Sequence, residues 1–136
     1  MLEQVDTTTS TTFEATPLSP TLLAGLRRLS SLEALPSNWD SYGSPPPRRL
    51  AVLLARGALA SAAALDAPPP VIGPISGGGI HLAWESRDRC IELNLFPDGT
   101  CEFLAAAEGN ESEGMLDMSD SASLRALLRW FLHSRT

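Results

Sequence analysis

The chain has 136 residues, 43% of them hydrophobic, and its 16 acidic residues against 10 arginines give a net charge of −6. Its length allows one domain with a sizeable core, because single domains typically contain about 100 to 150 residues. An acidic domain repels the phosphate backbone, so the charge argues against a nucleic-acid-binding protein. No apolar run approaches the roughly 18 residues that a membrane span needs. The acidic, threonine-rich start is unlike a signal peptide, and we expect a cytoplasmic protein.

Residues 1–17 lack any periodicity that could bury a face, and we expect a mobile tail there. Phe13 is the tail residue expected to dock on the domain or on a partner. The folded domain is then predicted to cover residues 18–136. Its first helix begins at Ser19 and Pro20, because serine caps helices and proline suits the first helical position. A stripe of leucines follows at helical spacing until the helix ends near Pro36: Leu22, Leu23, Leu26, Leu29 and Leu32.

A second serine and proline pair, Ser44 and Pro45, predicts the start of another helix. Its apolar stripe is built from leucines and small residues, and residues 66–70 end it with three prolines. A closing helix is predicted from the Ser119-Asp120 cap, with Leu124, Leu127, Leu128 and Phe131 on one face. The acidic, glycine-containing segment 108–114 before it is predicted to be a mobile loop.

Between residues 71 and 104 the apolar period changes to two, which indicates strands. Strands are expected at 71–75, 80–85, 90–96 and 100–104, the first an edge strand because it contains Pro74. The tripeptide Pro97-Asp98-Gly99 predicts a hairpin turn. The sequence therefore predicts an α+β fold, with two N-terminal helices, an antiparallel meander of three or four strands and a C-terminal helix, the helices packed on one face of the sheet.

Two cysteines, Cys90 and Cys101, could face each other across the predicted hairpin. Two cysteines do not make a disulfide framework, and free cysteine is among the most buried residue types. We expect buried, reduced thiols.

Several segments together carry a resemblance to a known family: Asn38-Trp39-Asp40-Ser41-Tyr42-Gly43-Ser44-Pro45-Pro46-Pro47, Gly78-Gly79-Ile80-His81-Leu82-Ala83-Trp84, Ile91-Glu92-Leu93-Asn94-Leu95, Pro97-Asp98-Gly99 and Arg129-Trp130-Phe131. Through them the chain resembles a family of small uncharacterised bacterial α+β proteins. In that family an NWD-S/G-YG-A/S-PPP segment joins two helices and precedes a strand pair. The resemblance covers the region from Leu18 to Leu104 and the last helix. It implies the fold and no activity, and Ala83 stands where the family tends to carry glutamate.

The loop containing Trp39, Asp40, Ser41 and Tyr42 is the first candidate site, since its rings could stack on a ligand and its carboxylate could hydrogen-bond to one. The structural interpretation is favoured. In it, Trp39 and Tyr42 close the end of the core, Asp40 caps a turn, and Gly43 supplies a backbone conformation that other residues resist.

A second candidate is the polar face of the predicted sheet, with His81 and Glu92 as its binding residues. Alternating polar residues are equally typical of a solvated antiparallel sheet, which is the favoured interpretation. No metal-ligand spacing is present, and the glycines at 77–79 precede a strand instead of a helix, so we expect neither a metal, a phosphate cradle nor another cofactor.

The leading functional hypothesis is a non-enzymatic protein-binding module: an antitoxin, immunity-like or accessory subunit acting with a neighbouring gene product. Its acidic surface would complement a basic partner. The alternative is a ligand-binding protein or enzyme, which predicts that Trp39, Asp40 and Tyr42 converge on one pocket with His81 or Glu92. A third hypothesis is self-assembly of a homo-oligomer through strand 71–75 or strand 100–104.

Overall fold

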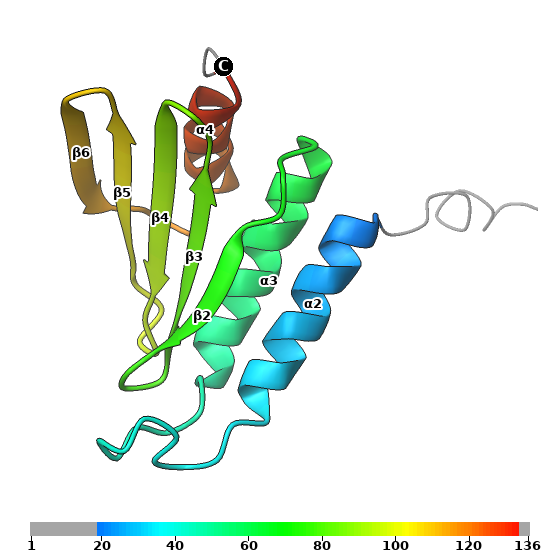
Figure 1. The fold of residues 1–136 in the computed structure, drawn as a ribbon, viewed down its shortest axis with the longest axis vertical. Coiled ribbons are helices and arrows are strands. Elements are labelled where there is room, and N and C mark those ends of the chain that lie inside the picture. The colour runs from blue at the N-terminus through cyan, green and yellow to red at the C-terminus, as the bar shows by residue number, and fades with distance from the viewer. Residues whose placement is uncertain (1–18, 134–136) are drawn as a thin grey trace, which may run out of the picture.

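The computed structural model describes residues 19–133; the predicted tail 1–17, with Phe13, lies outside them. Three helices and a five-stranded antiparallel sheet make up the α+β fold (Figure 1). In chain order the elements are α2 (Pro20–Glu33), α3 (Arg49–Ala64), β2 (Val71–Ile75), β3 (Gly79–Glu85), β4 (Arg89–Leu95), β5 (Cys101–Ala107), β6 (Asn110–Met115) and α4 (Ser121–Leu132).

The sheet is a simple meander in the order β2-β3-β4-β5-β6, with every neighbouring pair antiparallel. The four predicted strands and the Pro97-Asp98-Gly99 turn are present, but the meander has five strands and not three or four. The prediction of a loop at 108–114 is wrong, because β6 occupies most of that segment. Ala107 pairs with Asn110, which leaves only Glu108 and Gly109 to make the turn. A two-residue turn lays the following polar segment directly against β5, whatever its own β propensity.

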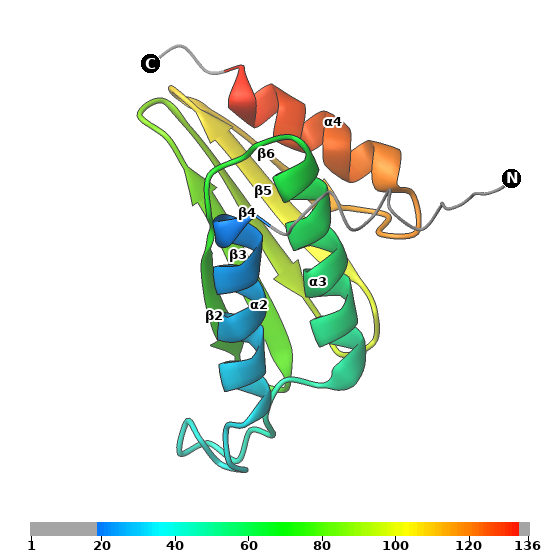
Figure 2. The ribbon, with the colours of Figure 1, turned by 90° about the vertical axis from the view of Figure 1, so that its right-hand side faces the viewer.

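All three helices lie on one side of the sheet (Figures 1 and 2). Side chains that alternate along a strand point to opposite faces, so each central strand sends every second residue into the core. Ile80, Leu82 and Trp84 of β3 are at most 1% exposed. The core also contains residues from every helix and from the other central strands: Leu29, Leu32, Val52, Leu59, Ile91, Leu93, Leu95, Cys101, Leu124, Leu128 and Phe131.

The helix caps predicted at both ends of the domain are confirmed. The Ser19 hydroxyl accepts a hydrogen bond from the backbone N–H of Leu22 at 3.0 Å, and Pro20 is the first residue of α2. At the other end, the Asp120 carboxylate accepts from the N–H of Ala122 at 3.1 Å and caps α4. Serine and aspartate caps of this kind typically contribute about 1 kcal/mol each.

The predicted start of the second helix is wrong, since α3 begins at Arg49 and not after Ser44. Three consecutive prolines, 45–47, separate the two positions. A residue that precedes proline is pushed out of the helical region, so Ser44 and the first two prolines cannot open a helix. The Ser44 hydroxyl is instead hydrogen-bonded to Asp40 and to the N–H of Gly77.

Cys90 and Cys101 are both free thiols that lie on opposite faces of the sheet. Cys101 pairs with core-facing Leu95 and is 0% exposed. Cys90 alternates with core-facing Ile91 and so points away from the helices. The two thiols therefore do not face each other across the hairpin. The expectation of buried, unpaired thiols is confirmed for Cys101, whereas Cys90 is unpaired but only partly buried.

The two edges of the sheet differ. At the β2 edge, the Arg28 guanidinium of α2 donates a hydrogen bond to the outward carbonyl of Ile72 at 3.1 Å. The backbone of Pro74, two residues further along β2, also faces outward, and proline has no N–H to offer to another strand. At the other edge, all six residues of β6 are exposed. Within residues 19–133 no helix is long and apolar enough to cross a membrane; the cellular location stays a prediction.

Candidate functional site

The loop between α2 and α3 is organised around the carboxylate of Asp40. Oδ1 accepts hydrogen bonds from the backbone N–H groups of Tyr42 at 2.9 Å and Ser44 at 3.2 Å. Oδ2 accepts from the hydroxyls of Ser44 at 2.5 Å and Ser76 at 2.6 Å. Ser76 lies in the β2–β3 turn, so Asp40 joins two loops that are more than thirty residues apart in the chain. The predicted turn-capping role of Asp40 is confirmed.

The backbone of this loop is unusually tight. Asn38, Ser41 and Gly43 have φ angles of 65°, 67° and 83°, in the left-handed region that favours glycine. The Asn38 side chain supports this path by accepting from the N–H of Gly43 at 2.7 Å. The predicted requirement for glycine at position 43 is therefore confirmed.

The two aromatic rings of the loop behave differently. Trp39 is half-buried and donates its indole N–H to the carbonyl of Pro45 at 2.8 Å, within its own loop. Tyr42 is 88% exposed, so the prediction that it closes the end of the core is wrong. The Asp40 carboxylate accepts four hydrogen bonds, from Tyr42, Ser44 and Ser76, and so ties the α2–α3 loop to the β2–β3 turn. We call this arrangement the Asp40 clasp.

The hydroxyls of Ser44 and Ser76, followed by the two backbone N–H groups, lower the pKa of Asp40 well below its ordinary value. A carboxylate with a lowered folded-state pKa contributes stability above its unfolded pKa of about 4, and this contribution is lost as the pH falls toward the folded value. We therefore expect Asp40→Asn to destabilise the protein at pH 7, and the difference from the wild type to shrink steadily below about pH 4.

Urea unfolding of both proteins across that pH range measures the effect. Ser76→Ala is the matched control, since it removes one donor and keeps the carboxylate; it is expected to flatten the wild-type pH dependence only in part. Parallel pH profiles for wild type and Asp40→Asn would contradict the clasp.

The face of the sheet opposite the helices is not covered by any element of residues 19–133 (Figure 2). Strand register sorts its side chains into three rows that run across the sheet. The rows are Gly73, His81, Asn94, Glu102 and Met115; then Val71, Ala83, Glu92, Leu104 and Glu113; then Glu85, Cys90, Ala106 and Glu111. We call this surface the open face.

Each strand from β3 to β6 places acidic side chains on the open face. This face carries five glutamates, and no ion pair within residues 19–133 involves any of them: Glu85, Glu92, Glu102, Glu111 and Glu113. The strands place no arginine among them. Arg89 of β4 alternates onto the helix side, where its guanidinium lies 4.7 Å from the ring centre of Trp130. The negative charges of this face are thus left for a partner to neutralise.

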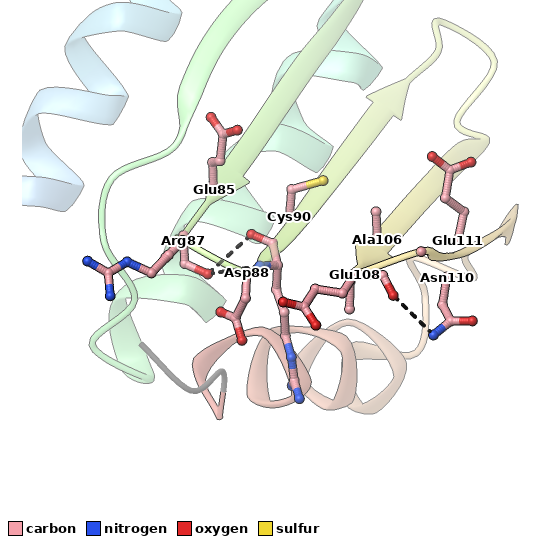
Figure 3. Close-up of a pocket in the computed structure, with 12 residues that line it drawn as sticks. Glu85, Arg87, Asp88, Cys90, Ala106, Glu108, Asn110 and Glu111 are labelled. Atoms are coloured by element: carbon pink, nitrogen blue, oxygen red, sulfur yellow. Dashed lines mark hydrogen bonds between the residues drawn. The ribbon is translucent and has the colours of Figure 1, made fainter.

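At one end of the open face lies a hollow of about 490 Å³ between the β3–β4 and β5–β6 turns. Figure 3 shows the side chains of Glu85, Cys90, Ala106 and Glu111 pointing to the same side of the sheet, with Arg87 in the adjoining turn. Burial first, and then the charges of nearby glutamates, raises the pKa of the Cys90 thiol. A raised pKa keeps more of the thiol in its protonated form, which is the weaker nucleophile.

The structure places the two predicted residues of the sheet on the open face, and the loop residues in the clasp. The Nδ1 atom of His81 lies 2.8 Å from Oδ1 of Asn94, its cross-strand partner. Glu92 lines a shallow hollow of about 280 Å³ with glutamates 102 and 113. In residues 19–133 no three His, Cys, Asp or Glu side chains are placed to share a metal ion.

No protein family, curated protein or solved structure matches this chain.

Sequence reasoning missed Glu111 and Glu113, because both were assigned to a loop. The signal that could have placed them is Gly109, which adopts a φ of 75° in the two-residue turn after β5. Pairing the residues on either side of this turn, from Ala107 with Asn110 onward, places both glutamates on the same face as Glu92 and Glu102. The extent of the open face thus depends on β6.

Proposed function

We propose that this protein is a non-enzymatic binding module whose open face docks a basic partner protein. The observation that carries the proposal is the uncovered sheet face, on which the strands place five glutamates and no arginine. Acidic side chains interleaved with apolar ones suit a protein surface, since interfaces combine apolar contact with charge complementarity. Val71 and Met115, which are 71% and 60% exposed, supply apolar area at opposite edges of this face.

The charge also selects the class of partner. A phosphate backbone or an anionic membrane would be repelled by the same glutamates, whereas an arginine- or lysine-rich protein surface would be attracted. Such attraction speeds association and excludes wrong partners more than it raises affinity. An antitoxin, immunity-like or accessory subunit acting with a neighbouring gene product is the biological form that this proposal takes.

The test is affinity purification of the tagged protein from its native host, compared with two triple variants of equal charge change. Glu92→Gln/Glu102→Gln/Glu113→Gln neutralises the open face. Glu33→Gln/Asp66→Asn/Asp120→Asn neutralises three acids elsewhere. Asparagine can cap α4 in place of Asp120 and can adopt the left-handed backbone of Asp66, so this variant should keep the fold. We expect the same basic protein to be recovered at constant stoichiometry with the wild type and the second variant, and to be lost with the first.

Equal recovery with both triple variants would contradict docking at the open face. A circular dichroism spectrum and an unfolding curve for each variant establish that the fold is unchanged. A partner of acidic composition would overturn the proposal even if the open face bound it.

A further inference from the structure

The exposed edge of β6 offers unpaired backbone groups. The N–H of Leu116, just after β6, donates a hydrogen bond to the carbonyl of Cys101 in β5 at 2.8 Å. This contact shows that the backbone groups of Leu116 point toward β5. Along an antiparallel pair, successive residues point their backbone N–H and C=O groups alternately toward and away from the partner strand. Counting back from Leu116, the backbone groups of Glu111 and Glu113 point outward, away from β5. β6 contains no proline to block a further strand.

Beside this edge, on the helix side, lies an apolar groove of about 420 Å³. α4 packs on α3 and β4, so it does not reach over β6, which stands clear of it in Figure 1. The groove runs between the two, with Leu127 and Trp130 of α4 on one wall. The strand side of the groove is formed by Phe103, Ala105, Ala107, Asn110 and Ser112, with Glu111 at the β6 edge.

The open face alone is small for a stable interface. Five strands about 4.8 Å apart and about six residues long cover roughly 20 Å by 20 Å, or about 400 Å², against about 800 Å² per partner in a standard complex. A partner that used only this face would bury less surface than a partner in a standard complex does. A strand added to β6 would widen the face and also fill the groove.

Resting on the proposed function, we propose that the partner docks an extended segment onto the β6 edge as a sixth strand, and that basic and apolar residues alternate along it. Alternate side chains of a strand point to opposite faces. Those on one side would meet Glu111 and Glu113, and those on the other would enter the groove beside Leu127 and Trp130. Main-chain pairing supplies affinity in such strand addition, and the side-chain alternation supplies specificity.

A second copy of this chain is a poorer occupant of the same edge. Antiparallel pairing of two β6 strands would set Glu111 and Glu113 of each copy beside those of the other on one face, and like charges opposite one another destabilise a sheet. Charge complementarity therefore favours a different, basic chain.

The direct test uses a fluorescein-labelled, end-capped peptide of eight residues in which valine and arginine alternate, with binding followed by anisotropy at low ionic strength. A block peptide with four valines before four arginines has the same composition and charge. Two further versions carry N-methyl groups on all valine amides or on all arginine amides, and each removes the donors of one strand edge. We expect the alternating peptide to bind at least about tenfold more tightly than the block peptide. One N-methylated version is expected to lose binding while the other keeps it.

Protein variants locate the site. Glu113→Pro removes an outward N–H and a charge, whereas Glu113→Gln removes only the charge; proline is tolerated on the outer side of an edge strand. We expect Glu113→Pro to weaken the alternating peptide about tenfold more than Glu113→Gln does, and Leu127→Ala in the groove to weaken it independently. Unfolding curves confirm that each variant is folded.

The outcomes separate this inference from the proposed function. Equal binding of the alternating and block peptides, with loss only in the Glu92→Gln/Glu102→Gln/Glu113→Gln variant, would leave docking at the open face standing and overturn strand addition. Failure of the alternating peptide to bind at all would also overturn strand addition, while the affinity purification still tests the open face. A size measurement of the protein alone tests the remaining occupant. A dimer of the wild type that Glu113→Pro abolishes would assign the β6 edge to a second copy of this chain and overturn the inference.

Discussion

Leu82→Ala is expected to lower the free energy of unfolding by about 2 to 5 kcal/mol, whereas Leu104→Ala is expected to cost about 1 kcal/mol. Both leucines lie in the middle of the sheet, in β3 and β5. Leu82 points to the helices and is 0% exposed, so its removal leaves a cavity in the core. Leu104 points to the open face and is only half-buried, so the shortened side chain is largely replaced by solvent.

Urea unfolding of the two variants at low protein concentration measures this difference. The comparison is matched, because the chemical change is the same and only the face of the sheet differs. Equal costs for the two substitutions would mean that a further layer covers the open face in solution, and this would contradict the interpretation of that face as free for a partner.

Gly79→Ala and Gly57→Ala are expected to change stability in opposite directions. A Cβ at position 79 would lie 2.7 Å from the backbone oxygen of Leu95 in the neighbouring strand, so the two central strands would have to separate. Overpacking of this kind typically costs about 1 to 3 kcal/mol. Gly57 lies on the exposed side of α3 with nothing within 4 Å of its added Cβ, and alanine there gains about 1 kcal/mol of helix propensity.

Thermal and urea unfolding of the two glycine variants measure the signs. A neutral Gly79→Ala would show that β3 and β4 separate easily at this end, which would contradict the close packing that places the Asp40 clasp beside the β2–β3 turn. A destabilised Gly57→Ala would show that the outer side of α3 is covered in solution.

The helices and central strands could be predicted because their apolar residues repeat with a clear period. α2 and α4 also begin at side chains that cap helices well, serine and aspartate. The start of α3 could not be predicted from the same signal. Prolines 45–47 keep Ser44 from opening the helix. Its hydroxyl bonds to Asp40 within the loop and to the N–H of Gly77, and the second contact exists only once the β2–β3 turn is folded against the loop.

β6 could not be predicted from composition, because its polar sequence has no apolar alternation and all of its residues are exposed. Its strand conformation comes from the turn that places it beside β5, a tertiary effect that overrides local propensity. The same limit applies to the candidate site. The acidic residues were visible in the sequence, but their gathering on one uncovered face follows from the register of five strands.

The Arg28 hydrogen bond to Ile72 and the proline at position 74 have a consequence for growth of the sheet. Polymers of sheet proteins lengthen when both edges of each copy accept another strand. Here the β2 edge is obstructed, so β6 of one copy has no open β2 edge to pair with in the next copy. Head-to-tail fibres of this chain are therefore disfavoured, even at the high local concentrations that follow synthesis.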